Sequence, residues 1–234
     1  MNNLQDFQQI FQPVISSYFR TKSKELGNIH SKGKVLAQII ADFTINGGKK
    51  IRPAIFYIAY TSYCKQRIEE ILEMSLLFEL IQSFALIHDD IIDHSPIRRG
   101  NPTIYKKYGT ETALLLGDLT LTLADEVFTK KMNELPVSLE VRKKCTSCFN
   151  ALKQEVLIGE YLDYVKDSDV KTVMLLKTAK YSFMRPMELG LILAGVDEKK
   201  IKRWLDIALK IGWIFQMKDD YVGTFGTEIK IGKS

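Results

Sequence analysis

Cysteine is scarce in this sequence, and its spacing excludes two kinds of protein. The 234 residues contain three cysteines, Cys64, Cys145 and Cys148. Cys145 and Cys148 form a C-x-x-C, but no second Cys or His pair stands near them, as a zinc site would require. An odd number of cysteines also argues against a disulfide framework. We therefore interpret all three as reduced thiols and expect a cytoplasmic protein.

Long apolar runs, targeting signals and blocks of one charge are also lacking. We find no apolar run that approaches the roughly 20 residues of a membrane span. The N-terminal stretch MNNLQDFQQIFQPVI has neither the basic start nor the cleavage site of a secretory signal. The net charge is +5, with acids and bases mixed along the chain. The sequence therefore predicts neither a membrane span nor a nucleic-acid partner.

Signals for β-structure are few, and helical patterns take their place. Alternating polar and apolar residues are scarce, and Asn-Gly or Asp-Gly turn pairs are nearly absent. Apolar residues recur at helical spacing near residues 4–18, 35–43, 141–162, 170–176 and 204–215. Between them lie segments with glycine or proline, at 46–53, 95–102, 134–137 and 193–200. Since we find no linker and no repeat, we expect one all-α domain of about ten helices over residues 1–234.

Three carboxylates stand at the end of the most apolar stretch, where lone charges are costly to bury. The segment LLFELIQSFALI runs into HDDIIDHSPIRRG, residues 88–100. If the helix continues to Asp93, then Asp89 and Asp93 lie one turn apart on the same face. Two such carboxylates repel unless a cation lies between them, and oxygen ligands suit Mg²⁺ first. Acidic pairs are common on solvated helix faces, so it is the apolar approach that favours a metal site.

A second acid pair and two basic clusters extend this pattern. The segment GWIFQMKDD again leads apolar residues into acids, at 219–220. The basic clusters are Lys49, Lys50 and Arg52 in GGKKIRP, and Arg98 with Arg99 after the first acid motif. Each cluster alone fits a solvated turn, but arginine suits bidentate phosphate contacts. Because no GxxxxGKS loop is present, the joint pattern favours a metal-bound polyphosphate over a P-loop nucleotide.

Five segments, in order, resemble the trans-isoprenyl diphosphate synthases of the polyprenyl synthetase family. They are GGKKIRP, DDIIDHSPIRRG, LLGDLTLTLADE, LKTAKYSFMRP and FQMKDDYVG. The resemblance implies a single bundle of long helices around a deep central cavity, the isoprenoid synthase fold, usually as a homodimer. It also implies a reaction in which an allylic diphosphate ionises and isopentenyl diphosphate attacks the cation. Loss of a proton then leaves a chain one isoprene unit longer.

The resemblance also implies roles for the residues that match. The metal ligands would be Asp89, Asp90, Asp93 and Asp219, with Mg²⁺ as the ion and Mn²⁺ as an alternative. The allylic diphosphate would be bound by Arg98, Lys177 and Lys233. Isopentenyl diphosphate would be bound by Lys49, Arg52, Gln82 and Arg99. The catalytic residues around the reacting centre would be Lys177, Thr178, Tyr181 and Gln216.

Product length and two other functions stay open at this point. Phe84 and Ala85, just before the first acid motif, resemble the chain-length residues of enzymes that make geranylgeranyl diphosphate, although Phe84 fits an ordinary core position equally well. Farnesyl diphosphate is the second candidate for the product, and longer chains are the third. A noncatalytic partner subunit typically lacks the first acid motif, and a terpene cyclase needs no GGKKIRP segment.

Two departures from the family pattern are visible. The second acid motif has Gly223 where the full motif has a last Asp. The family also usually continues past the segment GTEIKIGKS, so we expect this chain to lack the family's C-terminal helices.

Overall fold

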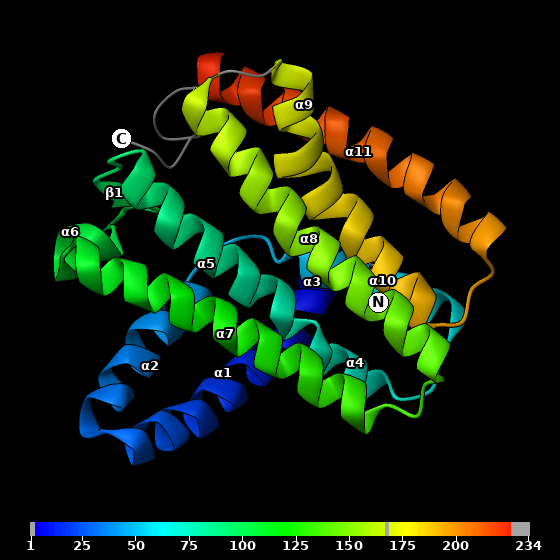
Figure 1. The fold of residues 1–234 in the computed structure, drawn as a ribbon, viewed down its shortest axis with the longest axis horizontal. Coiled ribbons are helices and arrows are strands. Elements are labelled where there is room, and N and C mark those ends of the chain that lie inside the picture. The colour runs from blue at the N-terminus through cyan, green and yellow to red at the C-terminus, as the bar shows by residue number, and fades with distance from the viewer. Residues whose placement is uncertain (1–2, 167–168, 226–234) are drawn as a thin grey trace. The chain divides into compact units, whose positions relative to one another are not determined.

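In the computed structural model the chain is helical over most of its length, which confirms the all-α fold (Figure 1). The structure describes residues 3–166 and 169–225, and within them one two-stranded hairpin accompanies the helices. The elements fall into two compact units. One comprises Met1–Ala54 and Glu69–Lys131, and the other comprises Ile55–Ile68 and Met132–Ser234. A single domain over residues 1–234 stays a prediction.

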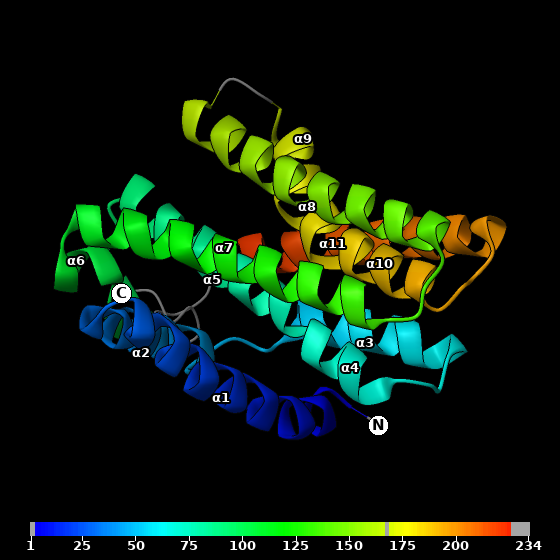
Figure 2. The same ribbon diagram turned by 60° about the horizontal axis from the view of Figure 1, so that its bottom comes forward.

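The first unit contains the amino-terminal helices and the hairpin. Its elements are α1 (Leu4–Ile29), α2 (Ser31–Ile45), the start of α3 (Ile51–Tyr63), most of α4 (Ile68–Met74), α5 (Leu76–Ile92), β1 (Ile97–Arg98), β2 (Asn101–Pro102), α6 (Ile104–Tyr108) and most of α7 (Thr110–Glu134). The helices α1 and α2 pack as a helical hairpin (Figure 2). The helical patterns predicted at 4–18 and 35–43 are confirmed, within longer helices.

Local chemistry explains where α1 begins and how tightly α2 returns along it. The side chain of Asn3 accepts a hydrogen bond from the backbone N–H of Asp6 at 2.9 Å, which caps the helix. A Cβ atom added to Gly33 would lie 2.1 Å from the carbonyl oxygen of Leu26, so glycine is needed for this approach. The buried apolar stripe of α1 is Phe7, Phe11, Ile15 and Phe19.

The stretch from α4 to α5 is the apolar centre of the first unit, and it corrects one expectation. Residues Ile68–Ile92 are long and apolar enough to span a membrane, contrary to the prediction that no run approaches that length. However, 67% of the most apolar window is buried inside the protein, as in the core helix of a folded domain. The hydroxyl of Ser75, between α4 and α5, donates to the carbonyl of Ile71 at 2.9 Å.

The second unit is built from long helices around a π-helical segment. Its elements are the rest of α3, α8 (Leu139–Val165), α9 (Val170–Met174), the π-helix η1 (Leu175–Met184), α10 (Arg185–Leu193) and α11 (Glu198–Phe225). Both α8 and α11 pack against η1. The patterns predicted at 141–162, 170–176 and 204–215 all fall within these helices.

Two glycines allow the backbones of this unit to approach closely. A Cβ atom on Gly159 of α8 would lie 2.9 Å from the backbone nitrogen of Lys177, and one on Gly212 of α11 would lie 2.5 Å from the Cα of Ala179. Any larger side chain at these positions would push α8 or α11 away from η1. The two glycines therefore allow α8 and α11 to pack closely on η1.

Candidate functional site

In the first unit, an arginine binds two carboxylates of the first acid motif. Asp89 and Asp90 lie in the last turn of α5, and Asp93 caps its C-terminus. A nitrogen of Arg98, Nη2, lies 2.9 Å from Asp89 Oδ2 and 2.6 Å from Asp90 Oδ1. Burial alone would lower the pKa of Arg98, but its bonds to Asp90 and the two carboxylate charges outweigh burial and raise that pKa. Asp90 is buried and Asp93 is exposed.

In the hairpin after α5, the adjacent residues Arg98 and Arg99 contact different parts of the first unit. Strands β1 and β2 pair Ile97 with Pro102 and Arg98 with Asn101. The two turn residues, Arg99 and Gly100, have φ of +55° and +76°, as a two-residue type I′ turn requires. Arg98 therefore turns toward the acids, while Arg99 reaches the GGKKIRP segment.

Arg99 packs directly on the glycine pair that precedes α3. A Cβ atom on Gly47 would lie 2.4 Å from Arg99 Nη1, so only glycine leaves room for the guanidinium. Its Nη1 donates to the carbonyl of Phe43 at 3.4 Å, and its Cζ lies 5.8 Å from the centroid of the Phe43 ring. Burial lowers the pKa of Arg99, as do the charges of Arg98 and Arg52, and Glu79 partly opposes them.

The charge of Arg52 thus acts on Arg99, the other arginine that the resemblance assigns to isopentenyl diphosphate. Lys49 is exposed, and its carbonyl accepts a hydrogen bond from Gln8 Nε2 at 3.1 Å. A cavity of about 200 Å³ borders this region and is lined by residues that include Asn46, Arg98, Arg99 and Lys107. The roles of these residues in binding stay predictions.

Lys50, the second lysine of the GGKKIRP cluster, is used within the protein. Its Nζ atom is buried and donates to the carbonyls of Thr44 and Gly47 at 2.7 and 2.6 Å and to Glu79 Oε2 at 2.8 Å. An ammonium has three donors, and all three are used within the protein. Sequence alone does not show which of two adjacent lysines turns inward.

The second unit gathers residues of the KT segment. Lys177, Thr178 and Tyr181 lie on η1, where Thr178 Oγ1 donates to Gln216 Oε1 of α11. This pair joins two predicted catalytic residues. A π-helix is rare and is frequently found at functional sites.

Sequence reasoning missed the carboxylates that accompany Lys177. Its Nζ atom lies 2.6 Å from Glu160 Oε2 and 2.7 Å from Asp163 Oδ2, both on α8. Glu160 and Asp163 are three positions apart, so the helical pattern of α8 was the available signal. Two ion pairs thus hold the ammonium of Lys177 in one orientation.

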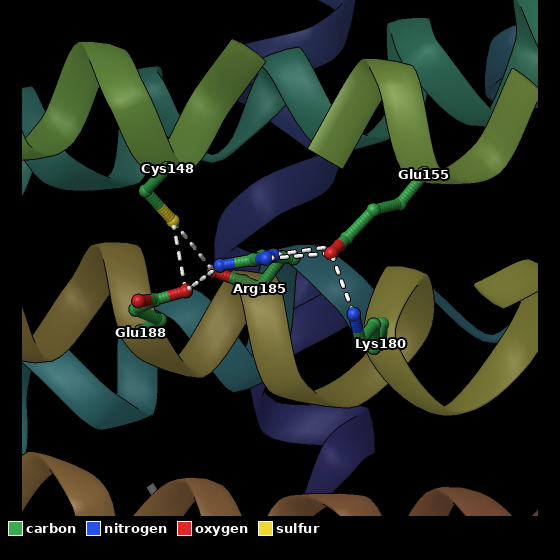
Figure 3. Close-up of polar contacts among 5 residues, drawn as sticks. All are labelled: Cys148, Glu155, Lys180, Arg185 and Glu188. Carbon is green, nitrogen blue, oxygen red and sulfur yellow. Dashed lines mark hydrogen bonds and ion pairs between the residues drawn. The ribbon is translucent and has the colours of Figure 1, made fainter. Parts of the chain in front are cut away.

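A half-buried ionic network lies at the C-terminal end of η1 (Figure 3). Arg185 lies between two carboxylates, with its nitrogens 2.6 Å from Glu155 and 2.5 Å from Glu188. Lys180 lies 2.8 Å from the same oxygen of Glu155. The network therefore ties η1 and α10 to α8.

Cys148 lies beside this network, and its thiol has low reactivity. Its sulfur donates to Glu188 Oε2 at 3.4 Å, and burial together with the Glu188 charge raises the pKa of the thiol well above its ordinary value. All three cysteines are free. The interpretation of Cys145 and Cys148 as reduced thiols one turn apart is confirmed, and both are buried on α8.

The remaining predicted residues lie on α5 or at the C-terminal end of the chain. Gln82 is half-buried, and Phe84 and Ala85 are buried. The ring of Phe84 meets that of His88 edge-on, with centroids 4.9 Å apart. Lys233 lies outside the described residues, as does the side chain of Asp219, whose backbone belongs to α11.

Oxygen chemistry at the first acid motif suits a hard dication. Within residues 3–166 and 169–225, no group of three His, Cys, Asp or Glu side chains is arranged to hold a metal ion. Asp89 and Asp90 are bonded to Arg98, whereas Asp93 is exposed. The carboxylate oxygens of Asp89 and Asp93 are ligands of the kind that Mg²⁺ prefers. The buried Asp90, bonded twice to Arg98, is better placed to orient the arginine than to bind an ion.

Comparison with known proteins agrees with this arrangement. The family described as Polyprenyl synthetase matches residues 33–234. A short chain isoprenyl diphosphate synthase from Methanocaldococcus jannaschii is 29% identical over 187 residues, covering 80% of this chain and 57% of the relative. A farnesyl diphosphate synthase from Bacillus subtilis is 32% identical over 197 residues, covering 80% and 66%. A crystal structure of geranylgeranyl pyrophosphate synthase from Corynebacterium glutamicum, complexed with isoprenyl diphosphate and magnesium, superposes with a TM-score of 0.87 at 27% identity, covering 99% of this chain and 71% of that one.

The fold and these likenesses first define a class, that of all-α proteins with the isoprenoid synthase fold. The chain belongs to the polyprenyl synthetase family. It spans 57% and 58% of the lengths of the Methanocaldococcus jannaschii relative and of a geranylgeranyl diphosphate synthase from Sulfolobus acidocaldarius.

Proposed function

We propose that this protein is a Mg²⁺-dependent prenyltransferase that condenses isopentenyl diphosphate with an allylic diphosphate. The observation that carries the proposal is that the two adjacent arginines of the hairpin, in the first unit, contact different groups. Arg98 binds the carboxylates of Asp89 and Asp90. The next residue, Arg99, packs on Gly47, which lies two positions before Lys49. One short turn thus links a cation-binding motif to an anion-binding cluster, as a reaction between a metal-bound diphosphate substrate and a second, metal-free diphosphate substrate would need.

The acids and the cations of the first unit have distinct tasks in this proposal. Mg²⁺ bound by Asp89 and Asp93 would neutralise the charge that develops on the leaving diphosphate. Asp219 keeps the ligand role that its motif assigns, and Mn²⁺ is an alternative ion. Arg98 would bind the allylic diphosphate while Asp90 holds its guanidinium in place. Lys49, Arg52, Gln82 and Arg99 would bind isopentenyl diphosphate.

The second unit would supply the groups that act on the allylic substrate. Lys177, oriented by Glu160 and Asp163, would bind its diphosphate. Thr178 and Gln216 are already bonded to each other, so their oxygens are fixed in direction and can stabilise a nearby carbocation. Tyr181 completes the set, and Lys233 keeps the diphosphate-binding role implied by the resemblance.

We propose geranylgeranyl diphosphate as the product, with farnesyl diphosphate and longer chains as alternatives. The support is the pairing of the bulky Phe84 with the small Ala85 on α5, both buried. Relatives carry mixed names, including geranylgeranyl, geranylfarnesyl and farnesyl diphosphate synthases. We further propose that the protein forms a homodimer and is located in the cytoplasm.

The test uses the chain alone with isopentenyl diphosphate, geranyl diphosphate and Mg²⁺, and it measures released diphosphate. We expect release that requires both substrates and stops when EDTA removes the metal. Asp89→Ala should lower the rate by at least about 100-fold, whereas the matched change Asp6→Ala, at the start of α1, should leave it unchanged. Release without isopentenyl diphosphate would indicate a cyclase, and no release would favour a noncatalytic subunit.

A further inference from the structure

Lys50 and Glu79 form a buried ion pair that the proposed reaction does not use directly. Their side chains are only 5% and 6% exposed, and Lys50 Nζ lies 2.8 Å from Glu79 Oε2. The other two donors of the ammonium go to the backbone carbonyls of Thr44 and Gly47. A buried charge needs partners of this kind, so the pair is fully committed to the protein interior.

The backbone of residues 46–50, called here the 46–50 loop, directs Lys50 inward. Gly47, Gly48 and Lys50 all have positive φ, with +55° at Lys50, a conformation that is uncommon outside glycine. Neighbouring Lys49 is exposed while Lys50 is buried. The local conformation is therefore coupled to the inward ammonium, and strain of this sort persists only where the surroundings hold it.

The same pair is connected to Arg99 through the backbone of Gly47. Lys50 binds the carbonyl of Gly47, and Arg99 packs on that glycine. The charge of Glu79 raises the pKa of Arg99 against the lowering effects of burial, Arg98 and Arg52. Glu79 thus offsets the repulsion among cations that stand close together.

A hydrogen bond between two uncharged side chains is a second tie that attaches the same end of α2 to α5. The hydroxyls of Thr44 and Ser83 lie 2.9 Å apart and are buried. Ser83 follows Glu79 by one helical turn, so both ties reach the same face of α5. Removing the charges of Lys50 and Glu79 together should therefore leave the end of α2 attached.

We propose that Lys50 and Glu79 are a positioning pair that sets the shape of the 46–50 loop, and with it the spacing of Lys49, Arg52 and Arg99. This inference rests on the proposed function, because those three residues belong, together with Gln82, to the proposed isopentenyl diphosphate site. The pair itself touches no substrate. Its effect is to hold the cations at the separation that a diphosphate needs before the ligand arrives.

The experiment separates positioning from stability by comparing Lys50→Met with the double variant Lys50→Met/Glu79→Gln. The single variant leaves the Glu79 carboxylate buried without its ammonium and should lower the unfolding midpoint by roughly 10 °C. The double variant should recover most of that loss. Its dissociation constant for isopentenyl diphosphate, measured by calorimetry, should nevertheless stay about tenfold to a hundredfold weaker than in the wild type. Lys32→Met, an equal change of charge at an exposed position of α2, should match the wild type in both measurements.

A kinetic readout and a second variant make the result decisive. The double variant should raise the KM for isopentenyl diphosphate with little change in the KM for the allylic substrate. Glu79→Asp, which keeps the charge but withdraws it by one methylene, should weaken binding in the same direction even if the double variant fails to fold. Wild-type affinity in either variant would overturn the positioning role while leaving the proposed function intact. Failure of the wild-type chain itself to bind isopentenyl diphosphate would overturn both.

Discussion

Arg185 offers the sharpest prediction about what holds the second unit together. In Arg185→Met, Glu155 keeps only Lys180 and Glu188 loses its guanidinium (Figure 3). Removing one partner of a fully buried pair costs about 3–5 kcal/mol. Because Glu155 and Glu188 are 15% and 19% exposed, water screens part of this, and we expect a loss of about 2–3 kcal/mol. The measurement is urea unfolding at pH 7, with the exposed Arg203→Met as matched control, which should change by less than about 0.5 kcal/mol.

The pH dependence of that loss tests its electrostatic origin. Burial would raise the pKa of Glu155, but its bonds to Arg185 and Lys180 outweigh burial and lower that pKa. A lowered carboxyl pKa contributes stability that is present above the unfolded pKa of about 4.3 and is lost as the pH falls through the folded value. The gap between wild type and Arg185→Met should therefore narrow below about pH 4. An equal gap at pH 7 and pH 3, or a loss no larger than in Arg203→Met, would refute the reasoning.

Three further predictions concern packing, metal and product. Gly212→Ala should lower the unfolding midpoint by several degrees, since its new Cβ would lie 2.5 Å from the Cα of Ala179, whereas the exposed Lys210→Ala should not; equal midpoints would contradict the close packing. Asp93→Ala should keep its helical circular dichroism and raise the Mg²⁺ concentration needed for half-maximal rate at least about tenfold, and an unchanged Mg²⁺ requirement would remove it as a ligand. Phe84→Ala should lengthen the products and Ala85→Phe should shorten them, as read by mass spectrometry, in steps of one isoprene unit; unchanged products in both active variants would place the chain-length limit elsewhere.

Helix positions could be predicted well because they rest on apolar spacing. The pattern over 141–162 lies inside α8, and that over 204–215 lies inside α11. The π-helical form of 175–184 could not be predicted, because apolar spacing alone does not distinguish it from an α-helix. The apolar stretch from 68 to 92 was underestimated, since its few charged residues interrupt the run without making it polar overall.

The candidate site was predicted by residue type more reliably than by geometry. The charge of Arg52 lowers the pKa of Arg99, but their shared role in binding a diphosphate stays a prediction. The inward turn of Lys50 follows from a positive φ that no residue-type rule marks at a lysine. The carboxylates beside Lys177 were missed because Glu160 and Asp163 are remote from it in sequence.

The most direct test of the central claim is to follow isotopically labelled isopentenyl diphosphate into product. The purified chain is incubated with geranyl diphosphate and Mg²⁺, and the prenyl diphosphates are identified by mass spectrometry. The account predicts labelled products longer than the primer by whole isoprene units, absent when EDTA is added and strongly reduced in Asp89→Ala. Unchanged substrates after long incubation with verified, folded protein would contradict it.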